Sequence, residues 1–108
     1  MARSDFDILK TISYAGTMDV LFAIIVGKNK FTDIMFDTEL NPGILNRLLK
    51  SLLTAQMIEK DTEGYHITEK GSKIVLYALQ IIDIDGEPEK HKEIRELLAN
   101  RAKQPANP

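Results

Sequence analysis

The segment from residue 40 to residue 52 has the spacing of a helix with two faces of opposite character. One face is apolar and carries Leu45, Leu49 and Leu52. The other face carries an amide, a guanidinium and an ammonium group, on Asn46, Arg47 and Lys50. These groups form hydrogen bonds and ion pairs but are not arranged as nucleophiles or metal ligands, so the chemistry they offer is recognition. The plainest alternative is that this face is simply solvated.

Catalysis and metal binding have little support in the sequence. The two histidines, His66 and His91, belong to separate segments, no His/Asp/Glu cluster has metal-ligand spacing, and no glycine-rich phosphate loop occurs. Glu87 stands four residues before His91, which an exposed ion pair on a helix explains. The absence of cysteine excludes disulfides and thiolate chemistry and leaves the redox compartment undetermined. We therefore expect a protein that is not an enzyme and uses no metal or cofactor.

Length and composition indicate one globular domain. A chain of 108 residues with 44% hydrophobic and 28% charged residues can bury one core. The net charge of -2 disfavours nucleic-acid binding unless positive charge is concentrated on one surface. The N-terminus lacks the charged and apolar regions of a signal peptide, and no apolar run approaches the roughly 20 residues that span a bilayer. We expect a soluble cytoplasmic protein.

Two helices are predicted before residue 28. Ser4 is a candidate N-cap with Asp7 three residues later, and apolar residues follow at helical spacing, namely Ile8, Leu9 and Ile12. The continuous apolar run at residues 20–26 suits either a buried strand or a buried helix. Because Gly27 followed by Lys28 is typical of a helix C-terminus, we interpret the run as a helix.

Two further helices are predicted in residues 31–52. The shorter one places three apolar residues on one face, Phe31, Ile34 and Met35. Thr32 is available as its N-cap, with Asp33 in its first turn. The longer one begins with Asn41 as a candidate N-cap and Pro42 at the first helical position, where the missing N–H costs nothing.

The second half of the chain predicts a hairpin between helices. The segments "MIEKD" and "YHIT" flank a turn at Thr62-Glu63-Gly64. Thr68 then caps a helix through "KIVLYALQIID", which Gly86 and Pro88 end before a last amphipathic helix. The expected fold class is mainly α with a small β-hairpin.

This order of elements, and three motifs within residues 19–82, resemble the winged helix-turn-helix domain, most closely that of the HxlR and MarR regulators of bacteria and archaea. "KFTDIM" is similar to the family's Arg-Phe-x-Glu-Leu, "LNPGILNRLLKSL" to its Ile-Ser-x-x-x-Leu-x-x-x-Leu-x-x-Leu, and "YHITEKG" to its Tyr-x-Leu-Thr-x-x-Gly. Lys30 stands where arginine is usual, Gln56 where glycine usually ends the recognition helix, and the wing tip lacks arginine.

The resemblance implies one winged-helix domain over residues 1–108, with its core at 17–84, flanking helices within 1–16 and 87–103, and a disordered tail at 104–108. It also implies a transcription regulator that binds double-stranded DNA. The recognition helix would enter the major groove with its N-terminal residues at the base edges, and these are Asn41, Gly43, Asn46, Arg47 and Lys50. Asparagine suits adenine, arginine suits guanine, lysine suits phosphate, and glycine allows close backbone approach.

Further cations are candidates for contacts outside that helix. Lys28 and Lys30 either clamp the DNA backbone or merely complement a helix dipole. On the hairpin, Lys60 and His66 would place the wing in a minor groove. However, carboxylates at the wing tip, those of Asp61 and Glu63, would repel phosphate.

An alternative is a winged helix that binds protein and has little affinity for DNA. The second helix of the motif is acidic, with Asp33, Asp37 and Glu39, although these residues could also face away from DNA. In this alternative, three apolar residues that we expect to be exposed, Phe36, Leu48 and Leu53, would form part of the contact.

A homodimer is expected because apolar residues run nearly all the way round "KIVLYALQIIDI", whereas a monomer needs one buried stripe. Helices at both chain ends offer further apolar stripes, and regulators of the family dimerise through such helices, which sets two recognition helices about one DNA turn, ~34 Å, apart. The expected interface residues are Ile8, Ile12, Tyr77, Ile81, Ile94, Leu97 and Leu98. The alternative is that the last helix folds back over its own domain.

Overall fold

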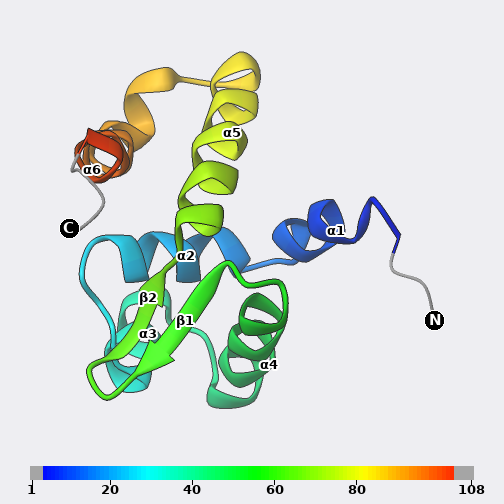
Figure 1. Ribbon diagram of the computed structural model, residues 1–108, viewed down its shortest axis with the longest axis vertical. Coiled ribbons are helices and arrows are strands. Elements are labelled where there is room, and N and C mark those ends of the chain that lie inside the picture. Colours follow the sequence, from blue (N-terminus) through cyan, green and yellow to red (C-terminus); the bar gives the residue numbers. More distant parts are fainter. Residues whose placement is uncertain (1–3, 104–108) are drawn as a thin grey trace.

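The computed structural model describes residues 4–103, in which helices surround one small hairpin (Figure 1). The elements are α1 (Asp7–Ser13), α2 (Thr17–Ile25), α3 (Phe31–Thr38), α4 (Pro42–Thr54), β1 (Ile58–Asp61), β2 (Gly64–Ile67), α5 (Glu69–Asp85), the 3-10 helix η1 (Pro88–His91) and α6 (Lys92–Lys103). The predicted fold class is confirmed. The tail predicted at 104–108 lies outside the described residues.

Both ends of α4 are held by local hydrogen bonds. At its start, Asn41 Oδ1 accepts from the Ile44 N–H at 2.9 Å and Pro42 follows the cap, as predicted. At its end, the N–H groups of Gln56 and Met57 donate to the carbonyls of Leu53 and Leu52, each at 3.0 Å. This is the Schellman arrangement, and it places Gln56 in the left-handed region with φ 60.

The N-cap predicted for α3 is wrong, whereas the one predicted for α1 lies just ahead of the regular helix. α1 begins at Asp7 after Phe6, but Ser4 makes the reciprocal hydrogen bonds predicted for it, since its Oγ accepts from the Phe6 N–H at 3.1 Å and its N–H donates to Asp7 Oδ2 at 3.2 Å. α3 begins at Phe31 after Lys30, so Thr32 lies inside the helix and cannot cap it, while Asp33 is in the first turn as predicted. Sequence rules place a helix end only to within one or two residues when no side-chain cap fixes it.

The hairpin is closed by a shorter turn than predicted. Asp61 pairs with Gly64, so only Thr62 and Glu63 lie between the strands, and Gly64 is the first residue of β2. Its φ is 126. Thr62 and Glu63 both have negative φ, so the turn is not one of the primed types, and the positive φ that follows it is supplied by Gly64, as in loops that end in a glycine bulge.

The junction between the hairpin and α5 is packed backbone against backbone. The Thr68 N–H donates to the Met57 carbonyl at 3.0 Å, and Thr68 Oγ1 accepts from the Gly71 N–H at 2.9 Å as the predicted cap of α5. Gly71 faces the same Met57 carbonyl so closely that an added Cβ would lie 2.0 Å from its oxygen. The start of α5 therefore rests directly on the residue that leads from α4 into β1.

One core joins α2, α4, the hairpin and α5. The largest side chains that are essentially inaccessible to solvent come from the helices α2 to α6 and from the residue before β1, and they include Leu21, Ile34, Leu45, Leu49, Leu52, Met57, Leu79 and Leu98. The hairpin adds the buried side chains of Ile58, Tyr65 and Ile67. The predicted apolar face of α4 is thus confirmed. It is wider than predicted, because Leu48 is also buried, at 7% exposure.

The last helix folds back over its own domain. Ile94 and Leu98 of α6 are buried in the core, and the Arg95 guanidinium pairs with Asp83 of α5. Arg101 donates to the Ile67 carbonyl of β2 at 2.7 Å. Ile94 and Leu98 were predicted in the dimer interface, but their side chains are instead buried against the chain's own core. Leu97 remains 38% exposed.

By contrast, α1 projects from the side of the domain and contributes no buried residue (Figure 1). Ile8 and Ile12 pack partly against the core. Within residues 4–103 no single helix is long and apolar enough to cross a membrane, and the one pair of helices that passes together, α1 with α2, is bent by 82°.

Candidate nucleic-acid interface

Residues 43–50 of α4 include a polar surface that faces solvent. Gly43, Asn46, Arg47 and Lys50 are all exposed on it, opposite the buried leucines. Neither cation has an ion-pair partner among residues 4–103, so both positive charges are available to a ligand. Because the helix contains no Asp or Glu, this surface is purely cationic.

Asn41 has a more limited role than the sequence indicated. Its Oδ1 accepts the capping hydrogen bond from Ile44, and a bidentate contact to adenine needs that oxygen together with the amide N–H. The Asn41 side chain therefore keeps only its N–H donors for a ligand, while neither polar atom of the Asn46 side chain makes a hydrogen bond to a described residue.

Charge around α4 is otherwise balanced. Residues 28–66 contain five Lys or Arg and six Asp or Glu. The carboxylates fall in two places, on or just after α3, with Asp33, Asp37 and Glu39, and on the hairpin, with Glu59, Asp61 and Glu63. Lys28 and Lys30 are exposed in the loop before α3. The positive surface is therefore confined to α4 and that loop.

Asn29 fixes the hairpin against the helices. Its carbonyl accepts from the Tyr65 N–H at 2.8 Å, and its Nδ2 donates to the Tyr65 carbonyl at 2.6 Å. A Cβ on Gly64 would lie 2.4 Å from the Asn29 carbonyl oxygen, so only glycine allows this approach. The loop between α2 and α3 is thus held against β2 by one backbone and one side-chain hydrogen bond.

Polar groups at the tip of the hairpin interact with one another. The Glu63 N–H donates to Asp61 Oδ1 at 2.8 Å, and His66 Nε2 lies 2.9 Å from the same oxygen. The backbone hydrogen bond from Glu63 and, secondarily, His66 hold the pKa of Asp61 below its ordinary value, so the carboxylate is charged near neutral pH. Lys60 lies over the Tyr65 ring, 5.2 Å from its centre.

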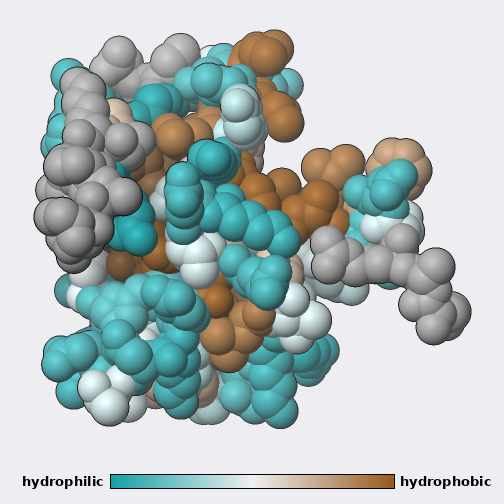
Figure 2. Space-filling model, in the orientation of Figure 1, coloured by the Kyte–Doolittle hydropathy of each residue, from teal (hydrophilic) through white to brown (hydrophobic). Residues whose placement is uncertain are grey.

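The predicted wing cations are therefore placed less favourably than those of α4. His66 faces a carboxylate, and Lys60 rests on an aromatic ring with acidic residues on both sides of it in the strand. Figure 2 shows hydrophilic residues over the lower part of the molecule, where α3, α4 and the hairpin lie in Figure 1. Of this hydrophilic surface, α4 is the part suited to a polyanion.

A family model described as a winged helix-turn-helix matches residues 5–85. The chain belongs to the winged helix-turn-helix family. The match runs from α1 to the end of α5, and it includes α3, α4 and the hairpin.

One solved structure shows that this fold also occurs in enzyme chains. The chain is similar to an O-methyltransferase (NcsB1) from neocarzinostatin biosynthesis, solved in complex with S-adenosyl-L-homocysteine, with 26% identity and a TM-score of 0.51. The similarity covers 63% of this chain but only 23% of the methyltransferase, so it concerns one part of that protein. No curated protein sequence matches the chain.

The three apolar residues proposed for a protein contact differ in their exposure to solvent. Phe36 on α3 is 77% exposed, whereas Leu48 is buried and Leu53 is half-buried against the core. The prediction that Leu48 is exposed is wrong, because it continues the leucine face of α4 between Leu45 and Leu52. A protein-binding surface on the winged helix would therefore depend on Phe36 alone among these three.

A second apolar surface lies on α1 and α5. Tyr77 and Ile81, both predicted interface residues, are 66% and 63% exposed, and Ile84 is 88% exposed. On α1, Phe6 just before the helix and Leu9 within it are 73% and 54% exposed. Brown, hydrophobic residues gather on these two helices in Figure 2. Phe6 opens the segment "FDILKTI", whose apolar stripe was predicted to contribute to a dimer, although Phe6 itself was not named among the interface residues.

Proposed function

We propose that the chain is a transcription regulator that binds double-stranded DNA with α4 in the major groove. The observation that carries this proposal is the exposed N-terminal surface of α4, which holds Asn46, Arg47 and Lys50 and no carboxylate, on a chain whose net charge is -2. A recognition helix uses this end at base edges, where Arg reads guanine and Asn reads adenine. The resemblance of three sequence motifs to HxlR and MarR regulators supports the same role.

In this proposal the other charged elements have secondary functions. Lys28 and Lys30 neutralise backbone phosphates beside the helix-turn-helix, which positions the protein without reading sequence. The wing stays at the edge of the contact, because the Asp61 and Glu63 carboxylates would raise the free energy of any approach to phosphate. The function is binding rather than catalysis, and it requires no cofactor.

A gel-shift titration with DNA from upstream of the protein's own gene, at two salt concentrations, tests this function. Binding should fall steeply with salt, because cations on the protein release counterions from the DNA. Undetectable binding at low salt would refute the proposal.

We further propose that the regulator is a homodimer joined along α5. Ile74, Tyr77, Ile81 and Ile84 repeat at intervals of three and four residues, which is the spacing of a coiled-coil seam. The last three are the exposed apolar residues of this helix, and a monomer would leave them in water.

Charge along α5 favours an antiparallel pair. Exposed Lys70 and Lys73 lie near the start of the helix, and exposed Asp85 and Glu87 lie at or just beyond its end. Antiparallel packing sets the lysines of one copy beside the carboxylates of the other, whereas parallel packing would set like charges together. Light scattering at micromolar concentration decides the oligomeric state, since a monomer mass would refute the dimer.

A protein-binding module is the second candidate function, and Phe36 is the observation that favours it. This ring is 77% exposed on α3, between the carboxylates of Asp33 and Asp37 in sequence. Such a module would show little DNA affinity at low salt and would lose its partner on Phe36→Asp. Loss of DNA binding on Arg47→Ala, with Phe36→Asp unaffected, would support the DNA-binding role instead.

A further inference from the structure

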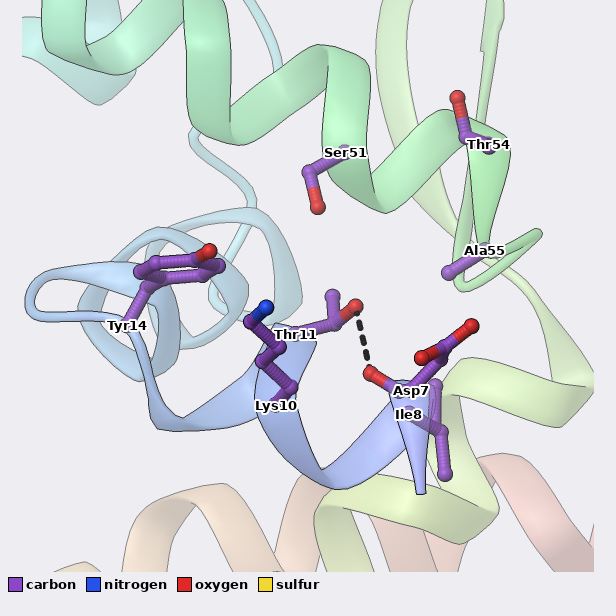
Figure 3. Close-up of a pocket in the computed structure, with 8 residues that line it drawn as sticks. All are labelled: Asp7, Ile8, Lys10, Thr11, Tyr14, Ser51, Thr54 and Ala55. Atoms are coloured by element: carbon purple, nitrogen blue, oxygen red, sulfur yellow. Dashed lines mark hydrogen bonds between the residues drawn. The ribbon is translucent and has the colours of Figure 1, made fainter. Parts of the chain in front are cut away.

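A cleft of about 360 Å³ separates α1 from the C-terminal half of α4. Its lining comes from α1 and the residue after it, with Asp7, Ile8, Lys10, Thr11 and Tyr14, and from α4 and its C-cap, with Ser51, Thr54 and Ala55. Figure 3 shows the Lys10, Thr11 and Tyr14 side chains extending from the α1 side toward α4, and the Ser51 hydroxyl pointing back toward α1. A space of this size lies within the range of small-molecule sites.

Two opposite charges line this cleft without neutralising each other. Asp7 and Lys10 are three residues apart on α1, a spacing that permits an ion pair, yet the ion pairs among residues 4–103 include neither of them. Asp7 Oδ2 accepts only the Ser4 N–H, and the Thr11 hydroxyl is already used, since it donates to the Asp7 carbonyl at 3.0 Å. The Ser51 hydroxyl has no hydrogen bond to another described residue.

An aromatic surface completes the cleft. Tyr14 is 52% exposed and lies at the Lys10 end, while Asp7 lies at the end nearer Ala55 (Figure 3). The cleft therefore offers a cation, an anion, a hydroxyl and a ring face at separate places along a short path.

We propose that this cleft binds a small zwitterion with an aromatic side chain, such as a free aromatic amino acid. The Lys10 ammonium takes the ligand carboxylate, with the Ser51 hydroxyl as a second donor, and the Asp7 carboxylate takes the ligand ammonium. The ligand ring packs on Tyr14. A ligand with only one of the two charges would leave the other charged group of the cleft without a partner.

The position of the cleft makes such a ligand a regulator of DNA binding, a role that rests on the proposed function. α4 is the recognition helix, and α1 borders the apolar surface proposed for the dimer through Phe6 and Leu9. Because α1 has no buried residue, a ligand that ties it to α4 changes the relation between the dimer surface and the helix in the groove.

Isothermal titration of the full chain with L-phenylalanine tests the site. Saturable binding is expected, with 3-phenylpropionate and phenethylamine, which each lack one charge, at least tenfold weaker. Lys10→Met and Asp7→Asn should each weaken L-phenylalanine at least tenfold. Lys92→Met, which removes an exposed lysine of α6 away from the cleft, should leave the affinity unchanged. Far-UV circular dichroism of every variant checks that the fold is retained.

Three results would overturn the proposal. If L-phenylalanine shows no saturable binding at millimolar concentration, the cleft is not a site for it. If 3-phenylpropionate binds with equal affinity, the ligand need not be a zwitterion. If Lys92→Met loses as much affinity for L-phenylalanine as Lys10→Met and Asp7→Asn, the effect does not come from the cleft. A DNA titration with and without saturating L-phenylalanine should differ more than threefold, and identical curves overturn the regulatory role. Ligand binding by a chain with no DNA affinity would refute only the proposed function, and DNA binding without ligand binding would refute only this inference.

Discussion

Replacement of Gly71 by alanine is expected to destabilise the fold by about 1–4 kcal/mol. The added Cβ would lie 2.0 Å from the Met57 carbonyl oxygen and 2.9 Å from its carbon, which are distances that real Cβ atoms do not reach. The carbonyl belongs to backbone between α4 and β1, so it cannot rotate away as a side chain would. Because an ordinary contact begins at 3.4 Å, either α5 or that backbone must move by about 1.4 Å to relieve the contact with the oxygen.

The free-energy loss has two parts and one offset. Overpacking in a tightly packed region costs about 1–3 kcal/mol. Displacement of the Met57 carbonyl also weakens the hydrogen bond from the Thr68 N–H, now 3.0 Å long, at a cost of about 1 kcal/mol. Alanine offsets up to about 1 kcal/mol of this loss, because its helix propensity is higher than that of glycine.

Urea denaturation followed by circular dichroism measures this loss, with Gly43→Ala as the matched control. Gly43 lies in the first turn of α4, and an added Cβ there meets only Asn41 Oδ1 at 3.6 Å, an ordinary contact. This control should be as stable as the wild type or more stable by up to about 1 kcal/mol. A wild-type urea midpoint for Gly71→Ala, or an equal loss in both variants, would refute the reasoning.

Three further changes test other parts of the structure. Gln56→Gly should stabilise the fold by up to about 1 kcal/mol, because glycine removes the left-handed strain at φ 60, and an unchanged urea midpoint would contradict this. Ile81→Glu should give a monomer mass in light scattering, whereas Ser13→Glu, an exposed change away from α5, should leave the dimer intact; a dimer in both would show that α5 is not the seam. Asp61→Asn keeps the Oδ1 acceptor for the Glu63 N–H and removes a charge from the wing, so DNA affinity at low salt should rise several-fold near pH 7. The gain should shrink as the pH falls through the lowered pKa of Asp61, because the wild type then also loses this charge; no gain at pH 7 would place the wing far from phosphate.

Much of the fold was predictable because its signals are local. The cap of α4 by Asn41 and Pro42, the cap of α5 by Thr68, and the end of that helix at Gly86 all depend on residues within a few positions of one another. The turn was predicted one residue too long because Gly64 supplies a positive φ equally well inside a turn or beside it. Leu48 was assigned to the surface, although its spacing from Leu45 and Leu52 already continues the apolar face.

The remaining features depend on contacts between distant segments. An amphipathic α6 can cover its own domain or a second copy. The pairing of Arg95 with Asp83 and of Arg101 with the Ile67 carbonyl, together with the burial of Ile94 and Leu98, shows that it covers its own. The anchoring of the wing by Asn29 joins residues 36 positions apart. The capping role that occupies Asn41 Oδ1 could have been anticipated, since a cap and a base contact compete for the same oxygen.

The most direct test of DNA recognition by α4 is an anisotropy titration of a labelled upstream duplex with the wild type, Arg47→Ala and Lys50→Ala at two salt concentrations. Arg47→Ala should cost about 1–3 kcal/mol on the specific site and relax its preference at one base position. Lys50→Ala should weaken binding to all sequences alike and reduce the salt slope by about 1. Wild-type affinity and salt dependence in both variants would show that DNA does not contact this helix.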